Sequence, residues 1–244
     1  WQAEQQLNKA EPGRLTDMSP EALATRNKQR LGWQKKLQQV DVARLSEQNQ
    51  INHAILSYRL ADDIDEYRYG AHLMPLTSES GFHTSLGFLP QRTTFRSLND
   101  YQLYIQQLSA IPRYMQQQTA WMQQGLASGM TQPKAVLKGF EQSIISYITE
   151  PEQSVFFQPF KTKPAYISAE QWQLLQNDAA KQIRTAVNPA YQAFYDFMVQ
   201  QYLPGARQDI AASNLPERHG EIRRQQLGTD LLAPFARDQK RDNP

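Results

Sequence analysis

The sequence predicts an all-α protein, an irregular antiparallel array of helices with long loops at about residues 75–97 and 151–167. The chain is rich in glutamine, which favours helices over strands. Helix-opening patterns such as Ser168-Ala-Glu-Gln171 recur, and apolar residues follow them at spacings of three and four. No alternating apolar pattern is long enough to predict a sheet. These observations together favour antiparallel helices.

The first two predicted helices lie before residue 75. Ser19-Pro20-Glu21 begins the first, because serine caps a helix well, proline fits its first turn, and an acid favours its N-terminus. This helix extends to about Val40. After a short break, Ser46 begins the second helix, which carries apolar residues at 4-4-3-4 spacing over residues 56–71 and ends before Pro75.

Three further helices are predicted after the first loop. Ser97-Leu-Asn-Asp100 opens a long helix that ends at Gly129, and Pro112 inside it predicts a kink or a division into two. A second helix is expected over residues 133–148. The third begins at Ser168, is interrupted by Pro189, and ends at Pro204-Gly205.

The composition changes after Pro216. Residues 217–244 are dense in charge and poor in aromatic residues, so they offer little apolar surface to offset the entropy of ordering. The sequence therefore predicts a helical part over residues 1–216 and a divergent, poorly ordered tail over residues 217–244.

Charge and motif content exclude several functions. Over 244 residues the net charge is +2, too small to indicate nucleic-acid binding. No apolar run reaches the roughly 18 residues expected of a membrane-spanning helix. Cysteine is absent, which excludes a thiol nucleophile and any cysteine-bound metal. No His-Glu-x-x-His motif is present, so the chain offers no catalytic residues of a zinc peptidase and no metal ligands.

The loop at residues 75–97 holds four candidate site residues. His83 lies beside Glu79, and a histidine on a loop can face a cleft and donate to a substrate carbonyl. Arg92 and Arg96 follow, and could bind a substrate carboxylate. The alternatives are a packing histidine and arginines that pair with nearby acids. A second cluster consists of neighbouring acids on one predicted helix, for which a solvated face is expected rather than a cation site: Asp62, Asp63, Asp65 and Glu66.

Several segments of the chain resemble a bacterial family known as domain of unknown function 885. The matching segments are Arg14–Ala22, Tyr67–His83, Phe95–Tyr101, Gly129–Pro133, Pro189–Tyr191 and Tyr202–Arg207, ending at Leu215-Pro216. They keep their order and spacing, so the resemblance covers roughly residues 14–216.

The resemblance implies a longer, largely helical protein that is exported to the periplasm or beyond, in some members as a lipoprotein. The family's C-terminal half carries a His-Glu-x-x-Pro-Gly-His-type motif and is similar to a zinc peptidase, in which zinc would activate water. This chain would then be the N-terminal half, inactive alone, with zinc expected only in the missing C-terminal half. That half and a peptide substrate would be its partners, and the residues of the loop, Glu79, His83, Arg92 and Arg96, would line one wall of the substrate cleft.

Two other functions stay open. The chain could be a standalone helical binding or scaffold module, or an intact enzyme that uses His83 with carboxylates of the loop.

The sequence also departs from the family after Pro216, where Glu217-Arg218-His219-Gly220 replaces the family's Asn or Asp followed by Gly. A frameshift or truncation at this point would explain the change of composition.

Overall fold

The structure is a computed structural model that describes residues 7, 10–211 and 215. These residues form helices joined by turns, and within them there is no strand, only an isolated bridge between Leu76 and Gly81. The predicted all-α class is therefore confirmed. The tail predicted over residues 217–244 lies outside the described residues.

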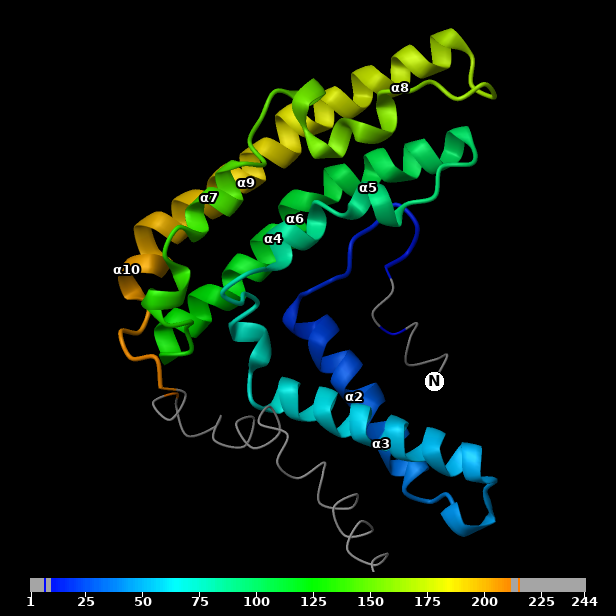
Figure 1. The fold of residues 1–244 in the computed structure, drawn as a ribbon, viewed down its shortest axis with the longest axis vertical. Helices are drawn as coiled ribbons and strands as arrows, with labels where there is room; N and C mark the ends of the chain where they lie inside the picture. Colours follow the sequence, from blue (N-terminus) through cyan, green and yellow to red (C-terminus); the bar gives the residue numbers. More distant parts are fainter. Residues whose placement is uncertain (1–6, 8–9, 212–214, 216–244) are drawn as a thin grey trace, which may run out of the picture.

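Two helices near the N-terminus form an antiparallel hairpin that projects from the rest of the molecule, and we call it the arm (Figure 1). Its helices are α2 (Pro20–Leu37) and α3 (Glu47–Arg68), joined through the short 3-10 helix η1 (Val42–Arg44). Ser19 caps α2 as predicted, since its side-chain oxygen accepts a hydrogen bond of 3.3 Å from the N–H of Ala22.

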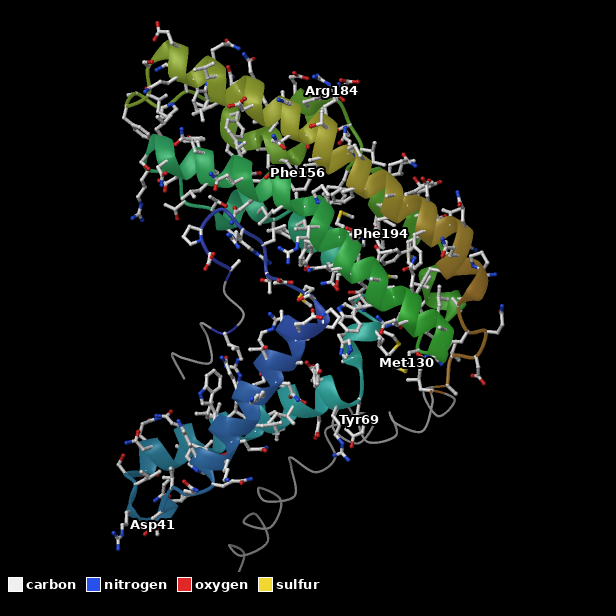
Figure 2. The ribbon with its side chains drawn as sticks, turned by 180° about the vertical axis from the view of Figure 1, so that it is seen from behind. Asp41, Tyr69, Met130, Phe156, Arg184 and Phe194 are labelled. Atoms are coloured by element: carbon white, nitrogen blue, oxygen red, sulfur yellow. The ribbon has the colours of Figure 1, made fainter. Side chains whose placement is uncertain are left out.

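The remaining helices form a larger body around α6 (Leu98–Ser128), which crosses the molecule as its longest described helix. Ser97 and Asp100 form the predicted capping box at its start. α8 (Ala169–Gln182) and α9 (Asn188–Phe197) pack along α6 and enclose an aromatic-rich core. Figure 2 shows Phe156 and Phe194 among these helices, both essentially buried, and Asp41 at the far tip of the arm.

Proline interrupts the helices less than the sequence predicts. α6 continues through Pro112 as one helix, so the predicted division is wrong. At Pro189 and Pro204 the chain instead forms wider π-helical turns, over Ile183–Val187 and Met198–Tyr202, and then continues into α9 and α10 (Leu203–Gly205). A π-turn shifts the hydrogen-bond register, which lets a residue without an N–H follow without breaking the helix.

Both predicted loops contain helical turns. The first holds α4 (Phe82–Leu86) and α5 (Leu89–Arg92), after the 3-10 turn η2 (Ala71–Leu73). The second holds two 3-10 turns, η4 (Pro151–Gln153) and η5 (Val155–Phe160).

The helix predicted over residues 133–148 is divided into η3 (Lys134–Leu137) and α7 (Phe140–Ile145). Gly139 separates them with a φ of 78°, a left-handed conformation that glycine adopts without strain.

Candidate functional site

The segment that leads into α4 is a tight turn. The hydroxyl oxygen of Thr77 accepts hydrogen bonds from the N–H groups of Glu79 and Ser80, at 3.3 and 3.0 Å. The bridge between Leu76 and Gly81 closes the turn. Glu79 lies exposed in this turn, so its carboxylate is available to solvent.

His83 lies in the core of the body. It belongs to α4, is 0% exposed, and its ring contacts the rings of Phe140 and Phe194 at centroid distances of 5.0 and 5.4 Å. Its Nε2 atom is 2.9 Å from the Oγ atom of Ser143. Burial lowers the pKa of His83 to about 4, because the charged imidazolium would lose its hydration. In this chain His83 is therefore a packing histidine, the alternative to a cleft-facing residue, and it is not exposed to solvent.

Arg92 and Arg96 are exposed at the other end of this segment. The guanidinium of Arg92 lies 5.7 Å from the ring centroid of Phe88, whose side chain is itself half exposed. The backbone N–H of Arg96 donates to Oδ2 of Asp100 at 2.8 Å, next to the start of α6. His83 is thus enclosed, whereas the side chains of Glu79, Arg92 and Arg96 are exposed to solvent.

The acidic cluster on α3 also forms no metal site. Oδ2 of Asp63 is 3.2 Å from Nε of Arg30, so one of its acids is engaged in an ion pair with α2. In residues 7, 10–211 and 215, no three His, Asp or Glu side chains lie together in a way that could hold a metal ion. The described residues therefore do not fit a zinc site.

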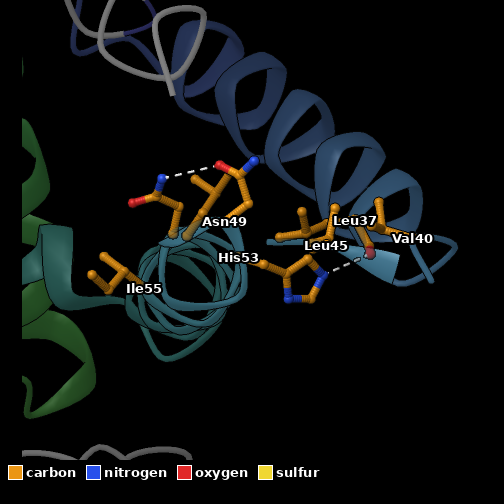
Figure 3. A pocket seen from close by; sticks show the side chains of 8 residues that line it. Leu37, Val40, Leu45, Asn49, His53 and Ile55 are labelled. Carbon is orange, nitrogen blue, oxygen red and sulfur yellow. Dashed lines mark hydrogen bonds between the residues drawn. The ribbon is translucent and has the colours of Figure 1, made fainter. Parts of the chain in front are cut away.

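A hollow at the tip of the arm was not predicted (Figure 3). It has a volume of about 460 Å³ and is mostly apolar. His53 lies on its wall, with Nε2 at 3.0 Å from the carbonyl oxygen of Leu37. The hollow is lined by residues from both arm helices and the turn between them: Leu37, Val40, Leu45, Asn49, Asn52, His53, Ile55 and Leu56.

The surface of the arm around this hollow is rich in exposed apolar side chains. Those at least about one-third exposed are Leu31, Val40, Val42, Ile51, Ile55 and Tyr58. Three of them recur at helical spacing on α3, at positions 51, 55 and 58. This second apolar stripe, beside the one over residues 56–71, is the sequence signal that could have identified the surface.

Membrane-spanning candidates are absent from the described helices, since none is both long and apolar enough to cross a bilayer.

Comparison with known proteins identifies a matching family and a solved structure with a similar fold. The family described as "Bacterial protein of unknown function (DUF885)" matches residues 3–233, which extends past Pro216, where the resemblance in the sequence ends. No curated protein matches. Among solved structures, the chain is similar to a protein from Colwellia psychrerythraea described as a "putative lipoprotein", with a TM-score of 0.75 and 16% identity. The similarity covers 94% of this chain and 43% of the Colwellia chain, so this chain spans less than half of that protein's length.

Proposed function

The chain belongs to the DUF885 family, and from this membership we propose that it supplies one wall of the substrate cleft in an exported, zinc metallopeptidase-like protein. In this proposal the chain binds and orients a peptide, and the zinc chemistry belongs to a further part of the protein. In this proposal the chain is inactive by itself, because its described residues hold no cluster that could bind the metal.

The observation that carries the proposal is the length of the related fold. Nearly all of this chain aligns with 43% of the Colwellia protein. In a protein of that length, more than half of the residues lie outside the region that aligns with this chain, and those residues can include a catalytic part. The lack of a metal-binding cluster in the described residues is consistent with this division, since the implied zinc ligands lie in the other part.

Export is part of the proposal. The Colwellia protein carries a lipoprotein description, and the family resemblance implies a protein beyond the inner membrane.

A standalone binding or scaffold module is the second candidate. The observation that favours it is the apolar arm tip, where Ile51, Ile55 and Tyr58 are each 42–50% exposed beside the hollow of about 460 Å³. Exposed apolar patches of this kind mark surfaces that bind other proteins. In this second candidate function the arm provides the binding surface for a partner protein, and no catalytic part is needed.

Photo-crosslinking tests the cleft-wall function. Peptides that carry a benzophenone group are irradiated with the Colwellia protein, and the attachment sites are mapped by mass spectrometry. We expect attachment both in the region that aligns with this chain and in the remainder, and we expect loss of both with excess unlabelled peptide. Attachment confined to the remainder would contradict a wall function, while attachment confined to the arm would favour the binding module.

A further inference from the structure

A groove lies where the arm joins the body, and it is distinct from the hollow at the arm tip. Its walls come from the chain before α2, from α2 and α3, and from the middle of α6, which meet at this joint (Figure 1). The groove has a volume of about 480 Å³, within the range of about 300–1,000 Å³ that is typical of small-molecule sites. Unlike the arm tip, it has charged side chains in its lining, which come from Arg26, Arg30, Asp63 and Glu66.

Arg26 is a buried cation on the wall of this groove. Its side chain is 8% exposed, and its Nη2 atom donates to the carbonyl oxygen of Asp17 at 2.8 Å and contacts Sδ of Met18 at 3.8 Å. Neither contact is with an anion. The carboxylate of Asp17 instead accepts from Arg113 at 2.8 Å. A guanidinium has five N–H donors, so Arg26 retains the capacity to bind an anionic group such as a carboxylate.

Gln118 lines the same groove and has a polar atom without a hydrogen-bond partner. It lies on α6, is 4% exposed, and its Nε2 atom donates to the hydroxyl of Tyr114 at 3.1 Å. Its Oε1 atom is buried and has no hydrogen-bond partner among the described residues. Because buried polar atoms are nearly always hydrogen-bonded, this oxygen is suited to accept an N–H from a ligand.

The part of the groove formed by α3 carries acidic side chains. Asp63 is paired with Arg30 across the two arm helices, with 3.2 Å between Oδ2 and Nε. Glu66 lies one turn further along α3 and lines the groove. None of the described ion pairs joins its carboxylate to a cation. Partial burial, and then the nearby Asp62 and Asp63, raise the pKa of Glu66. Arg30 acts in the opposite direction and compensates the negative charge only in part. A positively charged group of a ligand would supply that compensation.

We propose that this groove binds a small zwitterion that carries an ammonium and a carboxylate, the chemistry shared by free amino acids and short peptides. Arg26 binds the carboxylate, Gln118 accepts an N–H, and Glu66 faces the ammonium group. The site uses only side chains of this chain, so it does not depend on the proposed cleft-wall function.

Calorimetric titration of the full chain tests the site with defined probes. The zwitterions are glycine, L-leucine, glycylglycine and triglycine, and the half-probes are acetate and ethylammonium. We expect at least one zwitterion to bind at least about tenfold more tightly than either half-probe, because two charged walls contribute together. Tighter binding of the amino acids identifies a free amino acid as the ligand, and tighter binding of the longer probes identifies a peptide.

Variants assign the binding to this groove. Arg26→Gln and Glu66→Gln each should weaken binding of the best zwitterion about tenfold or more. Arg184→Gln removes an exposed arginine outside the groove and should change the affinity by less than about twofold. Glu66 lies on the exposed rim, so its variant keeps the test decisive if Arg26→Gln fails to fold. The proposal is overturned if no zwitterion binds below about 10 mM, if acetate binds as tightly, or if Glu66→Gln binds unchanged.

Discussion

The Nε2 atom of His83 donates a hydrogen bond to the hydroxyl oxygen of Ser143 across the contact between α4 and α7, at 2.9 Å. The direction follows from Ser143, whose single hydroxyl hydrogen is already donated to the carbonyl oxygen of Phe140 at 2.6 Å. The proton of the neutral imidazole is therefore on Nε2, and Nδ1 is a buried acceptor with no partner among the described residues. Protonation of Nδ1 would place an unpaired charge in the core.

This arrangement predicts a loss of stability in mild acid. The pKa of His83 is about 4 in the folded chain and near 6.5 when the residue is exposed, so the unfolded chain binds more protons between these values. The free energy of unfolding should fall by about 2 kcal/mol from pH 7 to pH 5. Urea denaturation at a series of pH values measures it.

His83→Gln is the control for this pH dependence, because an amide can donate to Ser143 without titrating. The variant should show a nearly flat free energy of unfolding between pH 7 and pH 5. An unchanged slope in His83→Gln would mean that the pH dependence originates in another group.

Alanine substitutions at two helical glycines should have opposite effects on the stability of the chain. A Cβ atom on Gly125 would lie 2.5 Å from the carbonyl oxygen of Met130 and 2.7 Å from that of Leu73, and neither backbone atom can move easily. Gly125→Ala should therefore destabilise the chain by about 1–3 kcal/mol. Gly32 on α2 has nothing within 4 Å of such a Cβ, so Gly32→Ala should stabilise it by up to about 1 kcal/mol. Thermal and urea unfolding of both variants check the signs, and a destabilised Gly32→Ala would contradict the geometry of the arm.

Two phenylalanines, one at the start of α4 and one at the start of α5, should differ in their contribution to stability. Phe82 is 4% exposed and its ring lies 4.7 Å from that of Phe194, so Phe82→Ala should cost about 3–5 kcal/mol. Phe88 is 52% exposed, and Phe88→Ala should change the free energy of unfolding by less than about 0.5 kcal/mol. Equal losses in the two variants would show that Phe88 is packed against a surface in solution.

Local signals in the sequence predict helix starts well and helix interiors less well. Ser19, Ser97 and Ser168 each cap a helix as expected, because a cap depends on residues within one turn. Pro112 does not divide α6, since contacts with α8 and α9 along its length outweigh the missing hydrogen bond. Such contacts join distant segments and are not visible in local patterns.

The candidate site was harder to predict for the same reason. The burial of His83 depends on Ser143 and Phe194, which lie 60 residues or more away in the sequence. The glycines and serines around His83 therefore left a cleft-facing and a packing histidine both open, and the fold places it in the core. The groove at Arg26 combines α2, α3 and α6, and no motif in the sequence marks that combination.

The central claim, that the metal chemistry lies outside this chain, is tested most directly by zinc content and peptide hydrolysis measured side by side. After dialysis with zinc and removal of the excess, this chain and the Colwellia protein are analysed for bound metal and assayed on a fluorogenic peptide library with and without a chelator. We predict about one zinc per Colwellia protein with chelator-sensitive hydrolysis, and neither property in this chain. Stoichiometric zinc or hydrolysis in this chain alone, or a Colwellia protein without either, would contradict the account.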